Sequence, residues 1–226
     1  MAFLNGDTRE AVKRKLDSFS GEARMVFFKE TLDCDTCPEE EEFLREMAGL
    51  SDHIKLDVIN RLTEPDQALL YGVTASPTLV IEGHAGSRVK FLGVPAGFEF
   101  ANLMESLEEA ANARAELSEE TREKLADLDT DVHIQVFVTP TCPHCPQAVR
   151  NAHKLAVEFP RIHADMVEAY EFPELSEKFK VSGVPKTVVN GRVGFVGAQP
   201  EGVLAEAILR AVSAENRGEE GEAWNS

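Results

Sequence analysis

The sequence predicts an α/β protein made of two similar folds in tandem, each a central mixed β-sheet flanked by helices. Three observations support this prediction. The chain has 226 residues, which is enough for two domains of ordinary size. Apolar runs of strand length alternate with amphipathic helical stretches along both halves. The second half also repeats the first at a fixed offset.

The repeat is anchored on two Cys-x-x-Cys motifs, Cys34/Cys37 and Cys142/Cys145, which lie 108 positions apart. The same offset relates six further pairs of identical residues without a gap: Pro38 and Pro146, Asp57 and Asp165, Val73 and Val181, Pro77 and Pro185, Val80 and Val188, and Gly83 and Gly191. The first copy then carries the extra residues His84–Ser87 before the register resumes. We interpret the two halves as a duplication, because two chance motifs would not share these downstream residues.

Each half is predicted to run β-α-β-α-β-β-α after a leading helix. In the first half the predicted elements are the helix Asp7–Phe19, the strand Met25–Phe28, the helix Pro38–Leu50, the strand Ile54–Ile59, the helix Asp66–Tyr71, the hairpin Thr78–Ile81 with Val89–Leu92, and the helix Phe98–Ala113. In the second half they are the helix Ser118–Leu128, the strand Val132–Val138, the helix Pro146–Phe159, the strand Ile162–Val167, the helix Pro173–Phe179, the hairpin Thr187–Val189 with Val193–Val196, and the helix Glu201–Ala214.

The join between the halves falls in the polar stretch Asn112–Glu120. We therefore expect an N-terminal domain over residues 1–114 and a C-terminal domain over residues 115–214. Residues 215–226 contain two glycines and four glutamates, and we expect them to form a disordered tail.

The net charge of −17 indicates a surface that repels phosphate backbones and anionic lipids, so neither nucleic acid nor a membrane surface is an expected partner. No apolar run approaches the ~18 residues that a membrane span needs. The N-terminal stretch lacks a basic region followed by an apolar core, which argues against a secretory signal. We expect a cytoplasmic protein.

All four cysteines lie in the two motifs, and close pairs in a reducing compartment indicate redox chemistry or metal binding. Each motif is expected to open a helix, where unpaired N–H groups and the helix dipole stabilise a thiolate on the first sulfur. Cys34 and Cys142 are therefore the predicted nucleophiles. Cys37 and Cys145 are predicted to resolve the mixed disulfide that forms with the substrate.

A metal site is the alternative interpretation of the motifs. Zinc ribbons usually place their two cysteine pairs about 15–20 residues apart on loops. Here the pairs open helices in two separate copies, so we expect no metal and no other cofactor. One alternative is left open by the sequence: a metal ion or an iron–sulfur cluster that bridges two chains through single cysteines.

The segments Tyr71–Val80 and Phe179–Pro185 resemble the thioredoxin segment that ends in a cis-proline beside the active site. Together with the two motifs, they resemble the tandem glutaredoxin-like protein disulfide oxidoreductases of thermophilic archaea and bacteria, over about residues 7 to 214. The resemblance implies two thioredoxin-like folds in tandem. It also implies an enzyme that reduces, forms or isomerises protein disulfides.

By the same resemblance, the peptide bonds Ser76–Pro77 and Val184–Pro185 are expected to be cis. The prolines would face the sulfurs and offer backbone to an extended substrate strand.

The sequence departs from thioredoxin at two places in each half. The tryptophan before the first cysteine is replaced by Asp33 and Thr141. The buried carboxylate six residues before the nucleophile is replaced by Phe28 and Val136. Another group must therefore accept the proton of each resolving thiol, and the sequence does not identify it.

The two motifs differ in their charged neighbours. Near Cys34 lie seven acidic residues, Glu30, Asp33, Asp35 and Glu39–Glu42, whereas residues 132–152 contain no acidic residue. His144, inside the second motif, can favour the thiolate when it is protonated. We therefore predict that Cys142 is the more reactive nucleophile and that His144 tunes it. The glutamates also suit a helix N-terminus, so helix stabilisation is an equal explanation. The other histidines are read as surface or packing residues.

No nucleotide-binding glycine-rich motif is present, so we expect a separate electron donor, a flavoprotein similar to thioredoxin reductase. Two alternative functions stay open. One is a dedicated electron carrier to a peroxidase, similar to the N-terminal domain of alkyl hydroperoxide reductase flavoproteins, in which one motif is often degenerate. The other is a non-redox chaperone or adaptor.

Overall fold

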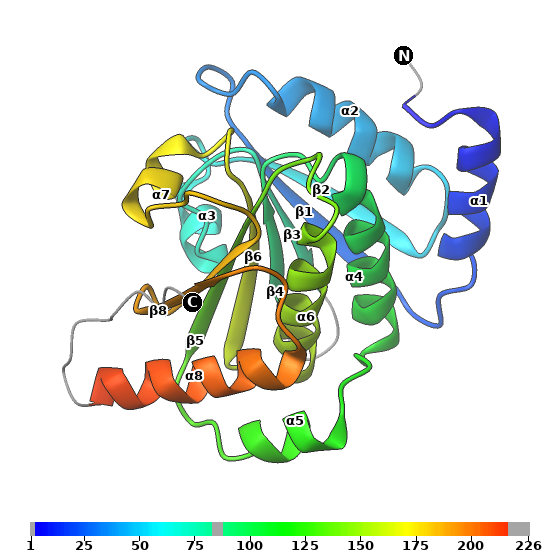
Figure 1. Ribbon diagram of the computed structural model, residues 1–226. Coiled ribbons are helices and arrows are strands. Elements are labelled where there is room, and N and C mark those ends of the chain that lie inside the picture. Colours follow the sequence, from blue (N-terminus) through cyan, green and yellow to red (C-terminus); the bar gives the residue numbers. More distant parts are fainter. Residues whose placement is uncertain (1–2, 83–87, 217–226) are drawn as a thin grey trace.

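The computed structural model describes residues 3–82 and 88–216 and contains one central mixed sheet of eight strands (Figure 1). The strands are β1 (Ala23–Lys29), β2 (Ile54–Asn60), β3 (Thr78–Glu82), β4 (Arg88–Leu92), β5 (Val132–Val138), β6 (Ile162–Glu168), β7 (Lys186–Val189) and β8 (Val193–Val196). The helices are α1 (Gly6–Leu16), α2 (Cys37–Ala48), α3 (Pro65–Tyr71), the 3-10 helix η2 (Gly97–Glu99), α4 (Phe100–Asn112), α5 (Glu119–Leu125), α6 (Cys145–Glu158), α7 (Pro173–Lys178) and α8 (Glu201–Asn216).

The strand order is β2-β1-β3-β4-β6-β5-β7-β8, so each half contributes four adjacent strands in the same internal order. The prediction of an α/β fold with a mixed sheet in each half is confirmed. The two sheets are continuous, because β4 pairs parallel with β6 from Val89 opposite Ala164 to Leu92 opposite Val167. Strands of the two halves do not interleave, and the proposed domain boundary at residue 114 stays a prediction.

Only β3 and β7 run against the other strands, since β1 is antiparallel to β3 and β5 is antiparallel to β7. The strands β1 and β5 therefore point the same way, through the chain of pairings across β3, β4 and β6. Their carboxyl ends, which precede the two cysteine motifs, meet at one edge of the sheet.

The main hydrophobic core lies on one face of the sheet and extends without interruption across both halves. Helices α4 and α6 stand side by side over this face (Figure 1). Alternation along β1 sends Met25 and Phe27 into this core, whereas Val26 and Phe28 point into a smaller cluster on the opposite face. A matching small cluster in the second half contains Phe137.

Several element ends differ from the sequence prediction by one to three residues. Helix α1 ends at Leu16 rather than Phe19, although Phe19 is still buried in the core. Helix α8 continues to Asn216, so the prediction of a disordered tail is wrong for Glu215 and Asn216, which extend a helix anchored by its buried face. The rest of the expected tail, residues 217–226, and the insertion His84–Ser87 lie outside the described residues.

Candidate redox sites

Each cysteine motif follows the carboxyl end of a strand and opens a helix, as the sequence predicted. Cys37 is the first residue of α2, after β1, and Cys145 is the first residue of α6, after β5. All four cysteines are paired, as the disulfides Cys34–Cys37 and Cys142–Cys145. The structure is therefore that of the doubly oxidised protein.

The first cysteine of each pair is more accessible than the second. Cys34 is half-buried and Cys142 is 8% exposed, whereas Cys37 is 1% exposed and Cys145 is fully buried. An incoming thiolate reaches the first sulfur more easily, and the second sulfur lies in the core at the base of its helix.

The peptide bonds Ser76–Pro77 and Val184–Pro185 are both cis, as the resemblance implied. Both prolines are buried and directly precede a strand, β3 or β7. The Pro77 carbonyl accepts a hydrogen bond from Gly93 N–H at 3.1 Å, and the Pro185 carbonyl accepts one from the corresponding glycine, Gly197, at 2.7 Å. The two sites thus share this backbone arrangement.

The charge difference between the sites is smaller than the sequence indicates, because ion pairs occupy part of the acidic cluster. Glu41 binds Lys29 at 2.5 Å and Arg45 at 2.7 Å, and Glu30 is paired with Arg61. Counting all seven carboxylates against Cys34 therefore overstates their effect.

In the second site, the exposed His144 is the residue before α6, and its side chain makes no capping hydrogen bond there. Its role in tuning Cys142 stays a prediction.

A buried carboxyl group that the sequence did not identify lies beside the second motif. Glu99, at the end of η2, is 1% exposed. Asn102 links it to the motif, since its side-chain amide donates to Glu99 Oε2 at 2.6 Å and to the carbonyl of Pro146 at 3.1 Å. Pro146 directly follows Cys145. Burial raises the pKa of Glu99 from 4.5 to about 7.

A second carboxylate reaches the first motif from the opposite half. Thr36, between the two cysteines, donates its hydroxyl to Glu171 Oε2 at 2.8 Å. Glu171 lies in the loop after β6, and its Oε1 accepts the N–H of Val94 at 2.8 Å. Each redox site is therefore completed by a carboxyl group of the other half. No local sequence signal indicates this exchange, since it depends on the pairing of β4 with β6.

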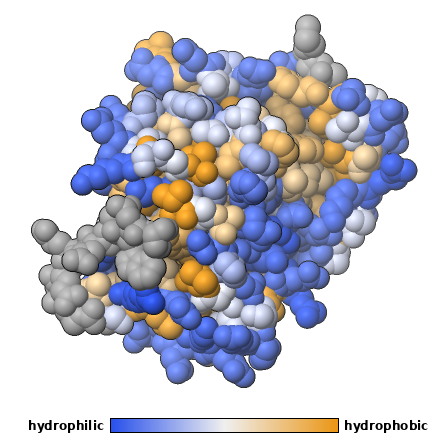
Figure 2. Space-filling model, in the orientation of Figure 1, coloured by the Kyte–Doolittle hydropathy of each residue, from blue (hydrophilic) through white to orange (hydrophobic). Residues whose placement is uncertain are grey.

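A cavity of about 580 Å³ lies next to both motifs. Thr36 of the first motif and Pro140, two residues before Cys142, line it. Its other lining residues are Phe3, Glu39, Glu40, Phe43, Val94, Pro95, Ala96, Gly97, Phe100, Glu168, Tyr170 and Glu171. Figure 2 shows apolar side chains gathered between α2 and the start of α4, where several of these residues lie.

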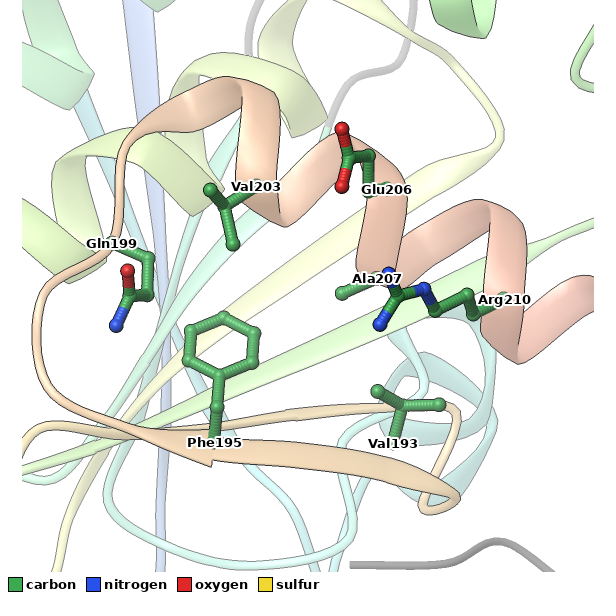
Figure 3. Close-up of a pocket in the computed structure, with 7 residues that line it drawn as sticks. All are labelled: Val193, Phe195, Gln199, Val203, Glu206, Ala207 and Arg210. Carbon is green, nitrogen blue, oxygen red and sulfur yellow. The ribbon is translucent and has the colours of Figure 1, made fainter. Parts of the chain in front are cut away.

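A smaller cavity of about 220 Å³ lies between β8 and α8, where Phe195 and Val203 face each other (Figure 3). None of the predicted site residues lines it. Within residues 3–82 and 88–216, no group of three or more His, Cys, Asp or Glu side chains is arranged to hold a metal ion. In the same part of the chain, no helix is both long and apolar enough to cross a membrane.

Residues 132–210 match the family described as thioredoxin domain. Over 80 residues the chain is 37% identical to a thioredoxin of Methanocaldococcus jannaschii, and this alignment covers 94% of that protein. The chain belongs to the thioredoxin family. The match covers 35% of the chain, so the remainder is compared through the structure.

Two solved structures resemble this thioredoxin-family chain over nearly its whole length. A protein disulfide oxidoreductase from Aeropyrum pernix is 28% identical, with a TM-score of 0.85 and coverage of 98% of this chain and 97% of that one. The alkyl hydroperoxide reductase AhpF of Enterococcus faecalis is 27% identical, with a TM-score of 0.83 and coverage of 91% and 99%. With its two Cys-x-x-Cys pairs, the chain is a thiol–disulfide oxidoreductase.

A sequence relative extends the second comparison. The corresponding alkyl hydroperoxide reductase component from Staphylococcus epidermidis is 25% identical over 191 residues. This alignment covers 84% of the chain but only 34% of that relative, so the chain spans about a third of its length.

Proposed function

We propose that the chain reduces, forms or isomerises protein disulfides, with both cysteine pairs active. Cys34 or Cys142 attacks the substrate disulfide as a thiolate and releases one substrate thiolate, which takes up a proton. Cys37 or Cys145 then loses its proton and attacks the mixed disulfide, which releases the second substrate thiol and closes the pair. The observation that supports this order best is that the first cysteine is more exposed than the second in both halves.

The backbone beside the cis-prolines is proposed to hold the substrate. Ser76 and Val184 precede Pro77 and Pro185 and are half-buried, so each can present its peptide group to an extended strand. This arrangement suits a polypeptide better than a small thiol, because an extended strand can pair with backbone groups.

Glu99 is proposed to accept the proton of Cys145 as the second step begins. A carboxyl group with a pKa of about 7 is part ionised near neutral pH, which suits proton exchange with a thiol. Asn102 keeps it beside the start of α6 through its bonds to Glu99 and Pro146.

The test compares insulin reduction by the parent with that by Cys34→Ser, Cys142→Ser and the double variant. We expect each single variant to retain part of the activity and the double variant to lose it. A double variant as active as the parent would exclude both proposed nucleophiles. Retained suppression of aggregation in a variant with all four cysteines replaced by serine would instead favour a chaperone.

A second candidate function, transfer of electrons to a peroxidase, is supported by the likeness to the alkyl hydroperoxide reductase AhpF. The 226 residues contain no glycine-rich nucleotide-binding motif, and we propose that a cytoplasmic flavoprotein similar to thioredoxin reductase supplies the electrons. The discriminating measurement is NADPH oxidation with a purified thioredoxin reductase and a two-cysteine peroxidase. Peroxide-dependent turnover that requires the chain supports the carrier function, whereas turnover with insulin alone supports general disulfide reduction.

A further inference from the structure

The first motif has a buried carboxyl group of its own, Glu40, one turn beyond Cys37 on helix α2. Cys37, Glu40 and Leu44 follow one another on the buried face of this helix, and each is at most 1% exposed. Residues three positions apart on a helix have Cβ atoms about 5–6 Å apart. Glu40 therefore lies on the same buried face of α2 as Cys37, one turn along the helix.

The Glu40 carboxyl group is buried without a hydrogen bond from any residue that the structure describes. Neither carboxylate oxygen finds a partner among the residues that the structure describes. Burial, and then the negative charge of Glu171, raise the pKa of Glu40 well above its usual value of 4.5. In the oxidised protein, burial and the charge of Glu171 therefore favour the protonated form of the Glu40 carboxyl group.

Glu171 is held in place by residues of the first half. Besides its bonds to Thr36 and Val94, its Oε1 lies close to Gly93, where an added Cβ atom would come within 2.8 Å of that oxygen. Gly93 also has a φ of +90°, which a side chain would disfavour. Glycine at this position therefore suits both the backbone conformation and the close approach of Glu171.

The other charged groups around Glu40 would not offset a negative charge on its carboxyl group. Glu39, on the same helix, and Glu168, at the end of β6, line the cavity beside it and are also acidic. The nearby Lys29 and Arg45 are both bound to Glu41. The surroundings on α2, on β6 and in the following loop thus favour the protonated acid.

We propose that Glu40 exchanges a proton with the Cys37 sulfur whenever the first disulfide opens or closes, and that Glu171 is the positioning residue that keeps this proton on Glu40 in the oxidised protein. The inference deepens the proposed function and rests on it only in that the Cys34–Cys37 pair must undergo exchange. It makes the first redox centre incomplete without the second half.

A donor thiolate reduces the Cys34–Cys37 disulfide in one exchange step. The donor sulfur bonds to Cys34, the bond between Cys34 and Cys37 breaks, and the electron pair leaves on Cys37. That sulfur takes the proton of Glu40, which becomes a carboxylate. In the reverse direction the carboxylate takes the proton from Cys37 as its sulfur attacks Cys34 of the mixed disulfide, the bond from Cys34 to the donor sulfur breaks, and the donor leaves as a thiolate.

The experiment isolates the first centre in the full chain by replacing Cys142 and Cys145 with serine. Reduction by dithiothreitol is followed across pH by trapping the new thiols with a maleimide and measuring the mass. Rates are divided by the concentration of dithiothreitol thiolate. We expect Glu40→Gln to slow reduction at least tenfold and to remove the fall of the rate at high pH, where parent Glu40 has lost its proton.

Two further variants separate proton transfer from structure. Glu171→Gln is expected to keep the maximal rate of reduction. The fall of the reduction rate at high pH should move to lower pH, because the variant lacks the charge that holds the proton on Glu40. Glu39→Gln, which removes an exposed carboxylate that water screens, is the matched control, and the fall of its rate should move much less than that of Glu171→Gln. A Glu40→Gln profile equal to that of the parent, or a Glu171→Gln profile with no shift, overturns the proposal.

A readout independent of reduction covers the case in which Glu40→Gln does not fold. Infrared titration of the oxidised protein follows the carbonyl band of protonated carboxyl groups. We expect a buried-acid band that persists to higher pH in the parent than in Glu171→Gln, and equal midpoints would overturn the proposal. If the parent pair resists dithiothreitol at every pH, the proposed function fails at this site instead.

Discussion

At the scale of single residues, the proton chemistry of each redox centre depends on carboxyl groups outside the positions that thioredoxin uses. Phe28 and Val136 occupy those positions, and both are fully buried. The structure instead brings Glu99 to the second motif and places Glu40 and Glu171 at the first. A carboxyl group supplied by a different element can serve the same chemistry, since proton transfer requires only reach and a suitable pKa.

The raised pKa of Glu99 predicts a pH-dependent stability. The folded protein holds a proton on Glu99 up to about pH 7, whereas the unfolded chain releases it near 4.5, so stability falls as pH rises between these values. The shift corresponds to about 3 kcal/mol of unfolding free energy. We expect Glu99→Gln to lack this loss when urea unfolding is compared at pH 5 and pH 7.5. A difference in unfolding free energy between parent and variant that is the same at pH 5 and at pH 7.5 would contradict the prediction.

Cys142 is expected to be the more reactive nucleophile, even though ion pairs offset part of the charge around Cys34. Both sulfurs share the same position before a helix, but Glu171 brings a carboxylate into the first motif, and His144 stands in the second. We expect faster alkylation of Cys142 than of Cys34 by iodoacetamide near neutral pH in the reduced protein, by less than about tenfold, read by peptide mass. Faster alkylation of Cys34 would show that the local charges do not control reactivity.

At the scale of elements, helices α4 and α6 join the halves through a polar contact inside an apolar interface. His153 on α6 is 1% exposed; its Nδ1 lies 3.0 Å from the hydroxyl of Ser106 on α4. Its ring packs edge-on against Phe91 of β4 at 4.9 Å between centroids. The sequence interpretation of this histidine as a packing residue agrees with its place in the interface.

Burial lowers the pKa of His153 to about 3, which makes the interface sensitive to acid. The folded protein keeps the ring neutral, whereas the unfolded chain binds a proton below about 6.5, so stability falls as pH decreases from 6.5 towards 3. We expect His153→Leu to be less stable than the parent at pH 7, through the lost bond to Ser106. Between pH 7 and pH 4 the difference in unfolding free energy between parent and variant should shift by about 3 kcal/mol in favour of the variant. Urea unfolding of the parent and of His153→Leu at the two pH values tests the prediction. An equal difference in unfolding free energy at pH 7 and pH 4 would refute it.

At the scale of the whole molecule, the halves share a sheet, a core and both redox sites. Separating them would expose the pairing edges of β4 and β6 and the facing surfaces of α4 and α6. Unpaired strand edges and exposed apolar faces promote association.

Residues 1–114 and 115–214 expressed separately are therefore expected not to form stable monomers. Mixing the two fragments should yield a one-to-one complex with native-like circular dichroism. Size-exclusion chromatography provides the measurement, and unfolding of the intact chain in a single transition is the control. Two folded, monomeric fragments that do not associate when mixed would show that the halves are independent domains.

The sequence by itself determined the repeated α/β pattern, the two cysteine pairs at helix starts, and the prolines that precede β3 and β7. These features are local, since each depends on periodicity, on a spacing of a few residues or on a motif that the duplication copied. The joining of two sheets through β4 and β6 was decided only by the tertiary structure, because strand pairing depends on which edges meet. The placement of Glu99 and Glu171 at opposite sites follows from that joint. Burial, which a linear pattern does not reveal, then sets the proton affinities of Glu40, Glu99 and His153.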